Sequence, residues 1–304
     1  MLKMKNSIFK RSLVIILLIS LIMAALLLVN RQTEAVSDTY NEDGLIEQRE
    51  LNISVNDENR KFVIINSGLS SNKINKLTDE LKIVYKKMVE LNDSPTYTPP
   101  KKIMIELNKS NLISYAQKNK VVLYNMYSDN YLLVHELSHT LFGFGNSDNN
   151  EFYGNYGFLT QEGLAVFLQF YLEPDKSAFP NNSVNPDKIV KYLKGKQEVI
   201  SLSKLGNPET AMNYFSIEGN TQTSYETWIS YVEAGSFIQF IINQYSFEEL
   251  FKIYNTENLE ASVSTVLNKS LTELEEEWLT YIDTSVSDLS QQDKDNIIFL
   301  FRRK

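Results

Sequence analysis

Hydrophobic residues recur along the chain at both strand and helix spacing, which predicts a mixed α+β protein. Short β-branched and apolar runs predict strands at 62–65, 102–107 and 121–124. Apolar residues at helical spacing predict helices at 71–91, 228–244, 247–254 and 271–282. We therefore expect a small N-terminal lobe that contains a β-sheet and a mainly helical C-terminal lobe.

The same pattern divides the chain into four segments. Residues 1–30 are apolar after a basic start, and the polar residues 31–50 predict a linker. Residues 51–128 are expected to form the N-terminal α/β lobe, and 129–304 the helical lobe. The part after the apolar segment, roughly 270 residues, is long enough to bury a sizeable core.

The N-terminal segment predicts a membrane anchor. Basic residues precede the run Leu13–Val29, which only Ser20 interrupts. As a helix this run is roughly 26 Å long, at the short end for a membrane span. The preceding positive charge places the N-terminus in the cytoplasm. Because Thr33-Glu34-Ala35 is a poor cleavage site, we expect a single-pass signal anchor with an extracellular C-terminal domain, the alternative being secretion after cleavage.

Charge and cysteine content exclude several classes of function. The chain has no cysteine, so disulfides, thiol catalysis and a lipobox lipoprotein are excluded. Five of the 30 Lys+Arg residues and none of the 38 Asp+Glu residues lie in 1–31, so residues 32–304 have a net charge of −13. This acidity argues against a nucleic-acid partner and against docking on an anionic membrane surface.

The chain's two histidines lie in one motif, His135-Glu136-Leu137-Ser138-His139. This is H-E-x-x-H, in which two imidazoles at positions i and i+4 of a helix hold one zinc ion and the glutamate activates water. Ser128 and Asp129 are N-cap candidates for such a helix, and Gly143 and Gly145 predict its end. The motif therefore predicts a catalytic zinc site with Glu136 as general base.

A catalytic zinc ion usually has three protein ligands, so a third must come from elsewhere. Without cysteine or another histidine it must be Asp, Glu or, less favourably, Tyr. Glu162 is the best candidate, because Thr160 can cap a helix that places it in the first turn, and Gly163 and Ala165 allow close approach to the first helix. Glu151 and Glu173 are weaker candidates.

The combination of H-E-x-x-H with the downstream Glu162-Gly163-Leu164-Ala165 resembles the gluzincin metallopeptidases, the peptidase MA clan. Phe158-Leu159 matches the aromatic-Leu pair before that glutamate. Residues 231–237 resemble the family's tyrosine-bearing helix and 271–278 a closing helix of bacterial members, so the resemblance spans about 62–282. It implies a gluzincin-like fold with one Zn²⁺ per chain on His135, His139 and Glu162.

The resemblance also implies a transition-state-stabilising tyrosine, for which Tyr231 is the candidate and Tyr225 the rival. Thermolysin-like members have Asp at the position of Val166, and their transition-state histidine is absent here. The Gly-x-Met-Glu-Asn motif of aminopeptidases is also absent, so trimming of free N-termini is not implied. In gluzincins an edge strand beside the site binds extended substrate, but the sequence does not identify that strand.

The expected function is a membrane-anchored, extracytoplasmic zinc metallopeptidase that hydrolyses peptide bonds. Its catalytic residues are expected to be Glu136 and Tyr231, and its partners a peptide or protein substrate and, through the N-terminal helix, the membrane. The alternative is a catalytically silent gluzincin-fold binding protein at the cell surface.

Overall fold

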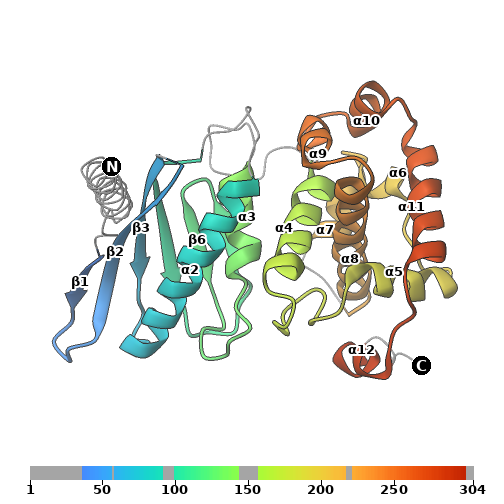
Figure 1. Cartoon of the computed structure of the whole chain (residues 1–304). Helices are drawn as coiled ribbons and strands as arrows, with labels where there is room; N and C mark the ends of the chain where they lie inside the picture. The colour runs from blue at the N-terminus through green and yellow to red at the C-terminus, as the bar shows by residue number, and fades with distance from the viewer. Residues whose placement is uncertain (1–35, 57, 92–98, 144–156, 217–220, 299–304) are drawn as a thin grey trace, which may run out of the picture.

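The computed structural model describes residues 36–56, 58–91, 99–143, 157–216 and 221–298. Two lobes stand side by side, a sheet-containing lobe formed by the first part of the chain and a helical lobe formed by the rest (Figure 1). The α+β class and the division into a sheet-containing and a helical part agree with the expectation from the hydrophobic pattern.

The N-terminal lobe contains a six-stranded mixed sheet in the order β1-β2-β3-β4-β6-β5. Its strands are β1 (Val36–Tyr40), β2 (Ile46–Val55), β3 (Glu58–Ile65), β4 (Lys102–Leu107), β5 (Tyr115–Gln117) and β6 (Lys120–Leu123). Strands β3, β4 and β6 are parallel, whereas β1–β2, β2–β3 and β5–β6 are antiparallel. Helix α2 (Ser71–Leu91) lies across one face of this sheet (Figure 1) and buries Ile74, Leu77, Leu81, Tyr85 and Met88.

The predicted strands are present, but three further strands were not predicted. The structure places β1 and the start of β2 in 31–50, where the polar composition predicted a linker. β1 is an exposed edge strand, and its Asp38 pairs with Arg49 of β2 at 2.7 Å. Such a strand shows no alternation of apolar and polar residues, because neither of its faces is fully buried. β5 was missed because it has only three residues.

The remaining helices are α3 (Leu133–Phe142), α4 (Phe158–Leu172), α5 (Pro186–Gly195), α6 (Leu202–Leu205), α7 (Ala211–Phe215), α8 (Thr221–Gln244), α9 (Phe247–Ile253), α10 (Leu259–Leu267), α11 (Leu271–Ser285) and α12 (Gln291–Asn296). Helix α11 begins at a capping box, in which the Ser270 and Glu273 side chains accept hydrogen bonds from each other's backbone N–H groups. Helix α3 packs beside α4, so the two lobes meet along these two helices (Figure 1).

Helices α4 and α8 approach each other closely at two glycines. A Cβ atom on Gly163 would lie 2.6 Å from the carbonyl oxygen of Ala234, and one on Gly235 would lie 2.4 Å from Val166 Cγ1. The prediction that Gly163 lets α4 approach the histidine-bearing helix was therefore wrong, since this glycine faces α8. The small residues bring together the helices that carry Glu162 and Tyr231.

A buried carboxylate links three helices of the helical lobe. Asp187, near the start of α5, accepts hydrogen bonds from Ser236 Oγ at 2.6 Å and Gln239 Nε2 at 2.7 Å, both on α8. Tyr281 of α11 also donates to it, at 3.4 Å, and the indole of Trp278 donates to Ser236 at 3.1 Å. Burial raises the pKa of Asp187 to about 6, although these donors oppose the shift.

In the described part of the chain, no helix combines the length and apolar character that a membrane span requires. The anchor predicted at residues 1–30 lies outside the described residues.

Candidate active site

Helix α3 carries the H-E-x-x-H motif but starts later than predicted. Its first residue is Leu133, so Ser128 and Asp129 are not its caps. Asp129 instead pairs with Lys73 at 2.6 Å and Lys76 at 2.8 Å on α2. The helix ends as predicted at Gly143, whose φ of 125° favours glycine. All ten residues of α3 are buried, which holds the motif rigidly between the lobes.

Helix α4 carries Glu162 and starts earlier than predicted. It begins at Phe158 after Gly157, so Thr160 is not its cap. The Thr160 hydroxyl instead donates to the Gly157 carbonyl at 3.2 Å and accepts from the backbone N–H of Asn255 at 3.0 Å. Glu162 therefore lies beyond the first turn, so the positive end of the helix dipole does not explain an acidic residue there.

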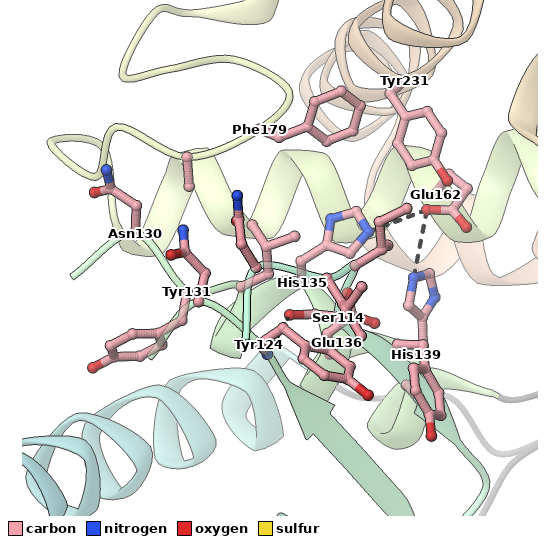
Figure 2. Close-up of a pocket in the computed structure, with 18 of the residues that line it drawn as sticks. Ser114, Tyr124, Asn130, Tyr131, His135, Glu136, His139, Glu162, Phe179 and Tyr231 are labelled. Atoms are coloured by element: carbon pink, nitrogen blue, oxygen red, sulfur yellow. Dashed lines mark hydrogen bonds and ion pairs between the residues drawn. The ribbon is translucent and has the colours of Figure 1, made fainter. Parts of the chain in front are cut away.

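Glu162 meets both histidines at one point between α3 and α4. One of its carboxylate oxygens lies 3.2 Å from His135 Nε2 and 3.5 Å from His139 Nε2 (Figure 2). All three side chains are buried, and their ligand atoms lie within 4.8 Å of one another. Burial opposes ionisation of Glu162, but the two imidazoles outweigh it and lower the pKa of Glu162 to about 2.

These three side chains fit a zinc ion. Two ligands about 2.0–2.1 Å from a tetrahedral ion lie roughly 3.4 Å apart, close to the two distances between Glu162 and the histidines. Two histidines and one glutamate form a ligand set found in hydrolytic zinc sites. Nδ1 of His135 is buried without a hydrogen-bond partner among the described residues.

Glu136 lines the same cavity as the three candidate ligands (Figure 2). It is buried, and burial raises its pKa to about 7, against the attraction of His135. The structure therefore provides two carboxyl groups of opposite tendency: Glu162 favours the charged form and Glu136 binds its proton more tightly.

The structure separates the two tyrosine candidates. Tyr231 lines the cavity, and its ring stacks on His135 with 6.1 Å between ring centroids (Figure 2). Its hydroxyl donates to the carbonyl of Phe215 at 3.4 Å. The Tyr225 hydroxyl donates instead to Glu198 at 2.8 Å, and Tyr225 does not line this cavity. Of the two tyrosines, Tyr231 is therefore the one that lines the cavity.

Of the weaker ligand candidates, Glu173 does not join the cluster among the described residues. Glu151 lies outside the described residues. Glu173 binds Lys176 at 3.0 Å, and Lys176 also binds Glu80 of α2 at 2.9 Å. The Tyr131 hydroxyl donates to Glu80, and Lys176 Nζ lies 4.1 Å from the centre of the Tyr131 ring. Burial and the hydrogen bond shared with Glu80 raise the pKa of Glu173 to about 8, against the attraction of Lys176. The ion pair between Lys176 and Glu80 joins the two lobes.

The cavity has a volume of about 530 Å³, within the usual range for ligand sites. One wall comes from the β4–β5 connection and β5, including Leu112, Ile113 and Ser114, and another from Phe179 after α4. The pattern of apolar and polar residues does not mark these wall residues. They lie in irregular segments without periodicity, and only their position beside α3 and α8 gives them a role.

No protein-family model matches the sequence, and no curated protein matches it. Among solved structures, the chain is similar to an M1 zinc metallopeptidase from Deinococcus radiodurans bound to a Tyr-Ser-Ala substrate, with 13% identity and a TM-score of 0.48 over 77% of this chain and 52% of that one. A second structure of that enzyme gives 12% identity and a TM-score of 0.47, over 81% and 54% of the two chains.

An aminopeptidase N family protein from Idiomarina loihiensis is also similar, with 10% identity and a TM-score of 0.39 over 86% of this chain and 46% of that one. The chain thus spans about half the length of the solved structures that it resembles. At this level of similarity, a function for the chain has to come from the geometry of its own side chains.

Proposed function

We propose that this protein is a zinc-dependent metallopeptidase that hydrolyses peptide bonds. The observation that carries the proposal is that His135, His139 and Glu162 meet in one cavity that Glu136 and Tyr231 also line. This places a metal-ligand set, a candidate base and a candidate hydrogen-bond donor around one space, which is the arrangement that hydrolysis requires.

The three ligands hold the metal from two helices. His135 and His139 offer their Nε2 atoms from α3, and Glu162 offers a carboxylate oxygen from α4. A bound zinc ion supplies a Lewis acid that acidifies water and polarises a carbonyl group. Because both helices are buried over this stretch, the ligands keep their positions during turnover.

Glu136 is proposed to move the proton. It accepts a proton from the attacking water and transfers it to the leaving amine. Burial raises the pKa of Glu136 above its ordinary value, which makes this carboxyl group a better proton acceptor than an exposed glutamate.

Tyr231 is proposed to stabilise the oxyanion that develops on the attacked carbonyl. Burial, together with the nearby Glu162 and Glu136, raises the pKa of Tyr231 well above its ordinary value, so its hydroxyl stays protonated and able to donate. Among the described residues that hydroxyl donates a 3.4 Å hydrogen bond to the backbone carbonyl of Phe215, which a substrate can replace. Loss of such a donor typically costs about 10²–10³ in rate.

Substrate is proposed to bind along β5. This strand ends the sheet next to β6, and Tyr115 and Ala116 of β5 line the cavity. An extended peptide can add to such an edge through backbone hydrogen bonds.

We further propose that the N-terminal segment anchors the protein in the membrane so that this site faces the cell exterior. The test is to add a protease to intact cells and to measure whether it degrades the protein.

The experiment that tests the function combines metal analysis with two variants of the full chain. Elemental mass spectrometry is expected to find about one zinc per chain, as a three-ligand site predicts. Glu136→Gln should keep zinc and lose turnover of a peptide library by about 10²–10⁴, whereas Glu162→Ala should lose zinc. Zinc binding without cleavage would favour the catalytically silent binding protein, and full activity of Glu136→Gln would refute the assigned base.

A further inference from the structure

Large apolar side chains from two separate segments of the chain stand exposed around the catalytic cavity. Leu112 and Ile113, in the β4–β5 connection, are 63% and 54% exposed, and Phe179, after α4, is 38% exposed. Phe179 also packs against Tyr231, with ring centroids 5.3 Å apart (Figure 2). Exposed apolar groups gathered around one cavity are typical of a binding surface.

The rest of the described lining is uncharged outside the catalytic group. It consists of amides such as Asn130, hydroxyls such as those of Ser114 and Tyr124, small side chains and further apolar residues. Among the described lining residues the carboxylates are Glu136 and Glu162, and there is no lysine or arginine. Both carboxylates are already assigned, one to the metal and one to proton transfer.

This lining affects which part of a peptide can be bound. A free α-ammonium or α-carboxylate loses water when it enters a cavity, and it needs a partner of opposite charge to offset that loss. Enzymes that act on chain ends must supply such a partner beyond the reacting groups. The described walls instead supply apolar surface, which stabilises an uncharged segment roughly in proportion to the area covered.

We propose that this cleft binds an internal, uncharged segment of an extended peptide, with a bulky apolar side chain next to the cleaved bond held between the Leu112–Ile113 wall and Phe179. The inference rests on the proposed peptidase function and adds its substrate class: an endopeptidase selective for apolar residues. Side chains of an extended peptide alternate in direction, so one of them can enter the cleft while its neighbours face solvent.

Binding can be measured without turnover in the full-length Glu136→Gln variant loaded with zinc. The probe is a fluorescent peptide with an acetylated N-terminus, an amidated C-terminus and a central Leu-Phe pair, followed by anisotropy. We expect the same peptide with free ends to bind no more tightly than the blocked one. Replacing the central pair by Asp or Lys residues should weaken binding by roughly tenfold or more, since the apolar walls lose their partner.

Two matched substitutions locate the effect. Ile113→Asp puts a charge on the cleft wall, whereas Ile83→Asp changes an equally exposed isoleucine of α2 that does not line the cavity. Both sites are on the surface, so both variants should fold. Ile113→Asp should weaken binding of the Leu-Phe peptide by roughly tenfold or more and strengthen binding of the Lys peptide. Ile83→Asp should change neither.

The outcomes distinguish this inference from the function on which it rests. Wild-type zinc protein that cleaves the blocked Leu-Phe peptide at an internal bond supports both. Cleavage only of peptides with a free end refutes the inference and leaves the peptidase function standing. Absence of cleavage from every peptide refutes the function and the endopeptidase claim with it. If Ile113→Asp and wild type bind the Leu-Phe peptide equally, the assignment of the wall is refuted. It is also refuted if Ile113→Asp changes the molecular mass of the protein in solution without changing peptide binding.

Discussion

Replacing Gly163 by alanine tests whether the close approach of α4 and α8 builds the site. The added Cβ would lie 2.5 Å from Ile238 Cγ1 and 2.6 Å from the Ala234 carbonyl oxygen. A side chain can rotate away, but a backbone oxygen cannot, so the helices must separate. Overpacking typically costs about 1–3 kcal/mol, and we take the upper end for a backbone clash. The better helix propensity of alanine returns roughly 1 kcal/mol, which leaves a net loss of about 2 kcal/mol.

The assay is urea and thermal unfolding of the full chain, with zinc affinity as a second readout. A loss of this size lowers the melting temperature by roughly 4–8 °C for a domain of this size. Zinc affinity should also fall, because Glu162 directly precedes the substituted residue. The matched control is Gly195→Ala at the end of α5, where an added Cβ meets nothing within 4 Å. Wild-type stability of Gly163→Ala, or an equal loss in Gly195→Ala, would refute the reasoning.

Two other predictions concern buried charges. Lys176→Met leaves the carboxylate of Glu80 without its cation and should cost about 2–3 kcal/mol in urea unfolding. This is below the usual range for buried pairs, because Lys176 and Glu80 are partly exposed. Lys76→Met, at an exposed pair, should leave the melting temperature unchanged. Since the folded protein holds the proton of Asp187 up to a pKa of about 6, above the usual value of 3.8, stability should fall by about 3 kcal/mol as pH rises through that window. Asp187→Asn should lack this dependence, and equal pH slopes for wild type and variant would contradict the assignment.

Local periodicity predicted the elements whose burial is regular. Helix α2 matches the predicted range 71–91, and β4 matches 102–107, because a buried face repeats at the spacing of the element itself. The same reasoning missed β1, since an exposed edge strand depends on its partner β2 rather than on its own apolar residues. It also misplaced the starts of α3 and α4, because Asp129 and Thr160 have tertiary partners that sequence does not reveal.

The sequence by itself determined the chemistry of the candidate site. Two histidines at helical spacing around Glu136 predict a metal-binding face locally, and the absence of cysteine and of other histidines limited the third ligand to Asp, Glu or Tyr. Glu162 was chosen among these for a Thr160 cap and for close approach of Gly163 to the first helix, and the structure shows neither. The structure nevertheless brings these three candidate ligands together. The sequence can predict the two histidine ligands because the spacing of side chains on one helix depends on the helix geometry alone.

Only the tertiary structure decided how the site is surrounded. It placed Tyr231 rather than Tyr225 in the cavity, turned Gly163 towards α8, and brought Ile113 and Phe179 to the lining of one cleft. These arrangements depend on how α3, α4 and α8 pack against each other and against β5. The physical reason is that contacts between segments far apart in the chain arise from packing of the whole core, which has no periodic signal in the sequence.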